Sequence, residues 1–408
     1  MSQALLAATG ATDTAPEPGP ALDTLRHIAT RTAAPARGVT VTSPHGATCT
    51  DRIRHMITAP STGIRLVYGC AAGITYTVSA LLEVGAVDYP VTFAGAATAT
   101  VSPGGYVTSD PIEVTLTAGQ AIHTRTRVST PLGSERGGSE GVVTVDLAQG
   151  DGHDHGDLTY VGAPAPTAGG GDVARHPLGI YAMTEATTTA LAVGGDSIIS
   201  GLNKWPVQWA TRAGIAWTNA SQSGEAVQHM PARRAARYGP SGLAAYTHYL
   251  CQYGINDSGS TTPDAFRATF VEHWAWCKAS LGGPKRVIQA TLLPWVSSTD
   301  GGVTLVNQTP ANATNEASRL VWNAWFRDGA PLVAGAPAAT GTTDPAAIRA
   351  GHADHPLWAV ADAAALVESS LNSGKYRVDQ GPIIGDGLHP APGAHALIGT
   401  GLPTSLLT

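Results

Sequence analysis

The sequence predicts two folded parts in series: an all-β sandwich or jelly roll, followed by an α/β domain with a parallel sheet. Its 408 residues are enough for two ordinary domains, each with its own core. Short β-branched runs separated by turn residues fill positions 60–150, whereas strand-like and helix-like segments alternate after position 186. We therefore expect an extended arm at 1–45, a β-domain at 46–185 and the α/β domain at 186–408.

The β-domain is predicted from runs in which apolar and polar residues alternate, as in Ile112–Leu116 and Ile122–Val128. The expected strands are 63–68, 74–84, 89–93, 111–116, 122–128 and 142–147. This spacing is typical of an antiparallel sandwich or jelly roll with one polar face on each strand. Residues 1–45 show no sustained period, so no core is expected there. The glycine-rich stretch 150–172 is expected to be an exposed loop.

The α/β domain is predicted from a change in the pattern of apolar residues after position 186. Its expected strands are 188–193, 244–253 and 286–293, and its expected helices are 205–213, 263–281 and 312–327. Strands that alternate with helices form a parallel sheet with helices on both faces. The last helix has apolar residues at the spacing of one buried face.

Composition excludes several classes of protein. The net charge is -6 and the 24 Lys and Arg residues are spread thinly, which disfavours nucleic acid as a partner. No apolar run approaches the roughly 18 to 20 residues needed to span a bilayer. The first 20 residues lack the basic start and apolar stretch of a signal peptide, so either the chain is not exported by that route or a leader has been removed. An extracellular or virion-associated location is expected, with a cytoplasmic one left open.

Neither a metal nor a cofactor is expected. Cys49, Cys70, Cys251 and Cys277 have none of the close spacings of a zinc site. Each successive pair could form a disulfide, but Cys251 and Cys277 lie in apolar stretches and fit small buried hydrophobes equally well. The histidines within 151–156 could hold a metal, although a glycine-flanked loop is a poorly organised cage and a solvated loop is favoured.

Two segments carry residues suited to nucleophilic catalysis. Ser197 follows an apolar strand and is expected to open a helical stretch, where its own amide can face a developing negative charge. Asp386 and His389 are three residues apart on a predicted tight turn. A serine hydroxyl needs a base to take its proton, and the base needs a carboxylate to orient it. Taken singly, these residues fit a helix cap and a turn equally well.

Two further loops carry possible hydrogen-bond donors for an oxyanion. Gly224 ends the loop that begins at Asn219, and a glycine lets the backbone approach a ligand closely. Asn256 follows the strand that ends at Tyr253, and its amide could donate to an oxyanion. Each residue alone also fits an ordinary turn.

These four segments occur in one order, each after a predicted strand. The arrangement resembles the SGNH hydrolase family, also called GDSL-type esterases, over residues of about 188–404. The resemblance implies a flavodoxin-like three-layer fold. It makes Ser197 the nucleophile, His389 the general base and acid, and Asp386 its orienting partner. It also implies an oxyanion hole formed by the amides of Ser197 and Gly224 with the side chain of Asn256. Ile198 stands where the family expects leucine, a small change between apolar residues.

The expected function is hydrolysis of small acyl esters, above all acetyl esters, on a carbohydrate or polysaccharide. One alternative is a lipase or thioesterase in which residues 295–315 cover an acyl site, although the mostly polar composition of that segment favours a polar substrate. A second is a phage tail-associated binding or assembly protein with an esterase fold. The β-domain is expected to bind or position a carbohydrate, with a structural or oligomerisation role given nearly equal weight.

Overall fold

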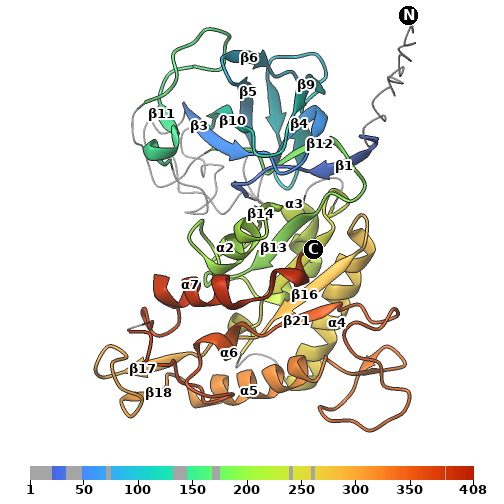
Figure 1. Cartoon of the computed structure of the whole chain (residues 1–408), viewed down its shortest axis with the longest axis vertical. Coiled ribbons are helices and arrows are strands. Elements are labelled where there is room, and N and C mark those ends of the chain that lie inside the picture. The colour runs from blue at the N-terminus through green and yellow to red at the C-terminus, as the bar shows by residue number, and fades with distance from the viewer. Residues whose placement is uncertain are drawn as a thin grey trace, which may run out of the picture.

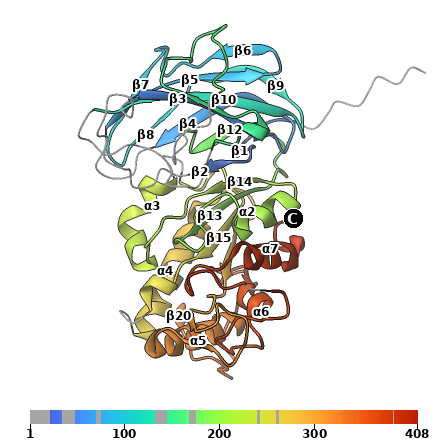
Figure 2. The ribbon, with the colours of Figure 1, turned by 90° about the vertical axis from the view of Figure 1, so that its left-hand side faces the viewer.

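The structure, a computed structural model, describes residues 21–33, 48–69, 75–131, 145–167, 175–238, 242–258, 262–381 and 383–408. The described chain forms two tiers (Figures 1 and 2). We call residues 48–184, with β1 at residues 24–27, the β region, and residues 185–408, with β2 at residues 32–33, the α/β domain. The β region is stacked on one end of the α/β domain, and the short segment 21–33 runs between the two.

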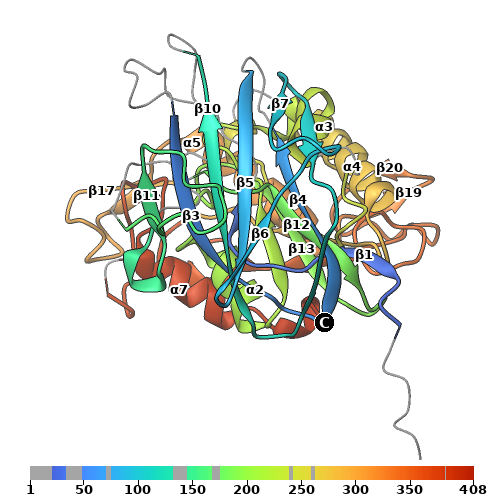
Figure 3. The same ribbon diagram turned by 90° about the horizontal axis from the view of Figure 1, so that it is seen from above.

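The β region consists of two antiparallel sheets. The sheet nearer the α/β domain, the inner sheet, has the order β1-β12-β4-β8, with β9 also paired to β4. Its strands are β1 (Thr24–His27), β4 (Ser61–Gly69), β8 (Tyr106–Thr108), β9 (Ile112–Leu116) and β12 (Gly179–Thr184). The outer sheet has the order β11-β3-β10-β5-β6, with β7 also paired to β5 (Figure 3). Its strands are β3 (Thr48–Met56), β5 (Tyr76–Val84), β6 (Val87–Pro90), β7 (Ala99–Val101), β10 (Ala121–Ser129) and β11 (Gly152–Asp154).

Both sheets contribute to one hydrophobic core. Leu66 and Ile180 of the inner sheet and Val78, Leu82 and Ile122 of the outer sheet belong to this core and are all fully buried. Alternation explains which side chains face inward, because successive residues of a strand point to opposite faces of its sheet. Assignment of the region to the jelly-roll class stays a prediction.

The α/β domain is built on a six-stranded parallel sheet of order β2-β14-β13-β15-β16-β21. Its strands are β2 (Thr32–Ala33), β13 (Ala190–Gly195), β14 (Ala216–Asn219), β15 (His248–Gln252), β16 (Arg286–Ala290) and β21 (Ala359–Ala361). When β2 is set aside, the remaining five strands follow the order 2-1-3-4-5 of their sequence, which is the flavodoxin-like doubly wound order. The parallel sheet predicted from the strand and helix rhythm is therefore present.

Helices cover both faces of this sheet. One face carries α2 (Trp205–Arg212), α6 (Ala363–Val367) and α7 (Pro392–Gly401), and the other carries α3 (Met230–Tyr238), α4 (Pro263–Ser280) and α5 (Ala313–Arg327). Leu191 and Val193 of β13 belong to the core of the first face, whereas Ala190 and Ala192 belong to that of the second. Two short hairpins extend from the domain: β17 (Val296–Ser298) with β18 (Gln308–Pro310), and β19 (Leu332–Val333) with β20 (Ala336–Pro337).

The expectation of an extended arm without a core is wrong for residues 24–33. β1 pairs with β12 in the inner sheet, and β2 pairs with β14 in the α/β sheet. Ile28 and Ala29, between these strands, are fully buried. The strands are too short to show a period in sequence, and their partners lie more than 150 residues away. Because this segment belongs to both sheets, removal of residues 1–185 would strip an edge strand from the α/β domain.

Two further expectations in the β region need correction. The predicted strand 142–147 lies partly outside the described residues, and Leu147 instead begins a 3-10 helix, Leu147–Gln149, capped by Asp146. The stretch 150–172 is not wholly a solvated loop, since β11 pairs with β3. Asp151 is buried and forms an ion pair with Arg31, with a distance of 2.6 Å between Oδ2 and Nη2. That pairing joins segments 120 residues apart and has no local signal in the sequence.

The cysteines behave as buried apolar residues where they can be described. Cys251 and Cys277 are buried free thiols, so this pair forms no disulfide. Cys49 is buried in β3, whereas Cys70 lies outside the described residues. No helix in the described ranges has the length and apolar character of a membrane span.

Candidate active site

The predicted site residues lie where a doubly wound sheet places its ligands. β13 and β15 are strands 1 and 3 in the order 2-1-3-4-5, so they are neighbours in the sheet. The chain reverses its direction of winding between them. Ligands bind outside the carboxyl ends of the strands at such a switch point. Ser197 follows β13, and Asn256 follows β15. The register pairs Gly195 with Gln252, so the two loops start side by side.

Ser197, His389 and Asp386 form one hydrogen-bonded line. The Oγ atom of Ser197 lies 2.7 Å from Nε2 of His389, and Nδ1 of His389 lies 2.7 Å from Oδ2 of Asp386. With the Nδ1 proton donated to the carboxylate, Nε2 can accept the proton of the serine hydroxyl. The structure thus brings the three residues together in the order that nucleophile activation requires. Contrary to expectation, Ser197 lies on a turn, and the helix α2 begins only at Trp205.

Asp386 is fixed by the turn that carries it. Its Oδ1 atom accepts hydrogen bonds from the backbone N–H groups of Leu388 at 3.0 Å and His389 at 2.7 Å. The hydrogen bond from the His389 side chain, together with these amides, lowers the pKa of Asp386. The carboxylate is therefore ionised and suited to orient the imidazole at neutral pH.

Gly387 docks this turn against β17. Its carbonyl accepts a hydrogen bond of 2.9 Å from the backbone N–H of Val296. Gly387 has φ of +95°, and a Cβ atom at this position would lie 2.1 Å from the carbonyl oxygen of Val296. Only glycine allows this close approach in this backbone conformation.

We expect Gly387→Ala to lower kcat by about 10- to 100-fold, because the turn must shift and a displacement near 1 Å misaligns catalytic groups. The measurement is steady-state hydrolysis of nitrophenyl acetate. Gly381→Ala is a matched control: Gly381 also has a positive φ, +77°, but a Cβ atom added there would meet no neighbouring atom within 4 Å. Equal activity of the two variants would show that contact with Val296 does not position the turn.

The predicted oxyanion donors surround the end of β13. Within the described ranges, the backbone N–H groups of Ser197 and Gly224 donate to no protein acceptor. The Asn256 side chain donates a 3.0 Å hydrogen bond from Nδ2 to the carbonyl of Glu225, which ties it to the Gly224 loop. The second N–H of that amide remains for a ligand. These three groups have the chemistry to bind a developing oxyanion.

Asn219 links the two loops, a role that the sequence did not reveal. This fully buried side chain donates from Nδ2 to the carbonyl of Ile199 at 2.8 Å, and its Oδ1 accepts from the backbone N–H of Ser221 at 3.0 Å. One amide thus holds both the nucleophile loop and the loop that ends at Gly224. The sequence placed Asn219 at the start of a loop, but the direction of its side chain depends on tertiary packing.

Solved structures similar to this chain include several hydrolases. No protein-family profile matches the chain, and no curated protein matches it. A G-D-S-L lipolytic family protein from Desulfitobacterium hafniense is 13% identical, with 54% of this chain and 98% of that chain covered and a TM-score of 0.36. A carbohydrate esterase family 2 enzyme with a carbohydrate-binding domain, from Corynascus thermopiles (Myceliophthora fergusii), is 13% identical, with 92% and 96% covered and a TM-score of 0.33.

A third solved structure is an active-site mutant of a family two carbohydrate esterase from Clostridium thermocellum. It is 11% identical, with 92% of this chain and 96% of that chain covered and a TM-score of 0.34. At identities and TM-scores this low, the chemistry of the α/β domain has to be judged from its own side chains.

Buried carboxylates lie next to the predicted site residues in sequence. Asp196 precedes Ser197 and is fully buried; its Oδ1 accepts from the backbone N–H of Ile198 at 2.9 Å, whereas Oδ2 has no partner among the described residues. Burial raises its pKa to about 8. Burial also raises the pKa of Asp257, next to Asn256, to about 6. Asp196 is therefore mostly neutral at pH 7. The sequence signal was available, since an acidic residue stands beside Ser197 and another beside Asn256.

The raised pKa of Asp196 predicts a pH dependence of stability. Between the unfolded pKa of about 3.9 and the folded value of about 8, the folded chain holds a proton that the unfolded chain has lost. The free energy of unfolding should therefore fall as pH rises through this range, by up to about 1.4 kcal/mol per pH unit from this group. Above pH 8 the contribution is constant.

We expect Asp196→Asn to reduce this slope, because the amide keeps the Oδ1 acceptor and does not titrate. Urea unfolding at pH 5 and at pH 7.5 measures how much the free energy of unfolding changes between the two pH values. The wild-type protein should lose more stability between the two pH values than the variant. Identical slopes would contradict a neutral Asp196.

One group of described residues has the donor types of a metal site, but it lies in the outer sheet. It consists of Cys49, Asp51 and His153. Asp51 already accepts from His153 Nδ1 at 2.6 Å and from the backbone N–H of Arg175 at 2.6 Å. The protein's own donors therefore occupy this carboxylate, and the group fits an internal ion network.

Proposed function

We propose that this protein is a serine esterase that acts through an acyl-enzyme. The observation that carries the proposal is the line from Ser197 Oγ through His389 to Asp386, with both distances 2.7 Å. The proposed oxyanion donors support it, because the backbone amides of Ser197 and Gly224 donate to no described protein group. An activated hydroxyl next to unpaired donors suits attack on a carbonyl carbon.

The reaction follows from the positions of these groups. Ser197 Oγ attacks the ester carbonyl while its proton passes to His389 Nε2. The carbonyl oxygen becomes an oxyanion that accepts from the two amides and from Asn256. When the carbon–oxygen bond to the alcohol breaks, His389 returns the proton to the leaving oxygen. Water, deprotonated by His389, then attacks the acyl-enzyme and releases the acid, so that Ser197 regains its proton.

The preferred substrate is a small acyl ester, above all an acetyl ester, of a carbohydrate. The side chains of His389 and Asp386 are 37% and 61% exposed, so the triad is open to solvent. An open site accepts a bulky alcohol such as a polysaccharide. It offers little buried surface for a long acyl chain, for which each buried methylene would contribute about 0.8 kcal/mol.

One observation favours a second candidate, hydrolysis of longer acyl esters. The turn between β17 and β18 carries Val303 and Val306, which are 64% and 81% exposed. This hairpin packs on the catalytic turn, since a Cβ atom on Gly302 would lie 2.7 Å from Ile384. Exposed apolar residues beside the site could contact a lipid chain. The overall polarity of 295–315 concealed this apolar tip in the sequence.

Activity on a series of nitrophenyl esters tests these candidates. We expect kcat/KM to be highest for the acetate and not to rise with acyl length up to the octanoate, because an open site offers a longer chain little surface to bury. The protein should also release acetate from an acetylated polysaccharide. Fastest turnover of the octanoate would instead support the lipid candidate. A folded protein inert toward the whole series would support the binding or assembly alternative and contradict an esterase.

A further inference from the structure

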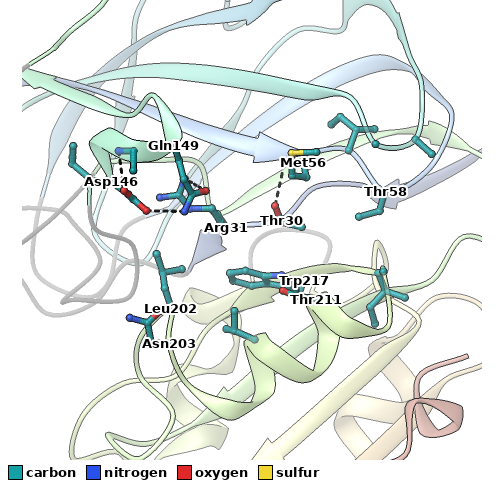
Figure 4. Close-up of a pocket in the computed structure, with 18 of the residues that line it drawn as sticks. Thr30, Arg31, Met56, Thr58, Asp146, Gln149, Leu202, Asn203, Thr211 and Trp217 are labelled. Atoms are coloured by element: carbon teal, nitrogen blue, oxygen red, sulfur yellow. Dashed lines mark hydrogen bonds between the residues drawn. The ribbon is translucent and has the colours of Figure 1, made fainter. Parts of the chain in front are cut away.

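A cavity of about 980 Å³ lies between the β region and the α/β domain (Figure 4). One wall is formed by the segments around Thr30, Met56 and 145–149, and the other by residues 202–217 around α2. Its volume is in the range of small-molecule sites, roughly 300 to 1,000 Å³. No residue of the proposed triad lines it. The cavity is therefore distinct from the proposed active site.

The charged side chains on its wall form hydrogen bonds within the protein. The Arg31 guanidinium donates to both carboxylate oxygens of Asp151, at 3.1 and 2.6 Å. Asp146 accepts from the backbone N–H of Ala148 at 3.0 Å and from the amide of Gln149 at 2.8 Å. The described lining therefore offers an anion no unbalanced positive charge, which disfavours a phosphate or a fatty acid.

Trp217 supplies a donor that lacks an acceptor. Figure 4 shows its indole between Thr30 and Arg31 on one side and α2 on the other. The residue is 1% exposed, and its Nε1–H has no hydrogen-bond partner among the described residues. A buried donor left unpaired costs about 1 to 3 kcal/mol. The nitrogen itself is closed to solvent, so a ligand oxygen would pair with it only after the indole or the side chains that cover it move.

Neutral polar side chains stand at the rim. Asn203 and Thr211 are exposed and present an amide and a hydroxyl. Apolar side chains such as Leu202 and Ile215 complete the wall. Leu202 and Asn203 also belong to the loop that starts at Ser197, so this wall and the nucleophile share one segment.

We propose that this junction cavity binds an uncharged sugar unit of an oligosaccharide. A pyranose ring offers apolar C–H faces to the aliphatic wall, and hydroxyl groups to the exposed side chains of Asn203 and Thr211. Pure hydrocarbon would displace water from those polar groups without replacing its hydrogen bonds. The choice of a sugar as the ligand rests on the proposed action on carbohydrate esters. The existence of a second binding site does not depend on catalysis.

Hydrogen exchange of the full chain locates the ligand. The Ser197→Ala protein is mixed with neutral cello- or xylo-oligosaccharides, and with decanoate as an anionic apolar probe. At about twice the dissociation constant, bound sugar should slow exchange roughly threefold in segments 145–149 and 207–217. Thr211→Trp fills the cavity from an exposed helical position and should abolish this protection. Thr400→Trp, on the exposed last turn of α7, is the matched control and should retain it.

Asn203→Leu is a second variant, since it removes the rim amide at an exposed position. It should weaken sugar binding about fivefold, the effect of one hydrogen bond. The proposal would be overturned if decanoate alone gave protection. Protection that is confined to 195–201 and 383–390, or that survives Thr211→Trp, would overturn it as well. Failure of the esterase proposal would appear separately, in the nitrophenyl ester assay of the wild-type protein.

Discussion

Ser197→Ala is expected to lower kcat for nitrophenyl acetate by about 10⁴-fold or more, because no other group in the proposed mechanism can form the acyl-enzyme. The protein should stay folded. Ser197 is only partly buried, and its hydroxyl contacts His389 rather than the hydrophobic core. Thermal unfolding should thus give a midpoint close to that of the wild-type protein.

Ser200→Ala is the matched control for this substitution, since Ser200 lies in the same loop and is also partly buried. It should keep most of the wild-type kcat. A folded Ser197→Ala protein with activity near that of Ser200→Ala would remove Ser197 from the mechanism. The line of hydrogen bonds to His389 would then be a structural feature of the loop.

Asn256→Ala should lower kcat by about 10²- to 10³-fold and leave KM within a few-fold of its wild-type value. The reason is that the side-chain amide faces charge that develops only in the transition state. The substitution also removes the hydrogen bond to the Glu225 carbonyl, which holds Asn256 beside the Gly224 loop. Steady-state kinetics on nitrophenyl acetate separates kcat from KM.

Ser258→Ala controls for disturbance of the same short helix, because among the described residues the Ser258 hydroxyl donates only to the carbonyl of Ile255, within its own turn. It should retain near-normal kcat. If Asn256→Ala changed KM alone, the amide would serve ground-state binding of the substrate. The oxyanion role would then fall to the backbone amides of Ser197 and Gly224.

Local patterns predicted the parts of the fold that local physics determines. Alternation located strands such as β9 and β10, and helical spacing located α5 within a residue at its start. The proximity of Asp386 and His389 could be predicted because three residues on one turn cannot lie far apart. Their approach to Ser197 was inferred from the ends of strands, but the turn lies well beyond the end of β21, past α6, and is docked instead against the backbone of Val296.

Features that depend on distant partners could not be predicted in this way. β1 and β2 are four and two residues long, and only their pairing with β12 and β14 gives them a structure. Asn219 looked like an ordinary turn residue because its two hydrogen-bonded loops meet only in the folded chain. The junction cavity likewise combines Thr30 with Trp217, which are far apart in sequence.

The most direct test of the central claim is covalent labelling with a fluorophosphonate, which reacts with activated serine hydroxyls. The folded wild-type protein is incubated with the reagent, digested and analysed by peptide mass spectrometry. We predict one adduct per chain, on Ser197, with labelling greatly slowed in His389→Ala because the base is lost. A folded wild-type protein that remains unlabelled, or that carries its adduct on another serine, would contradict the account.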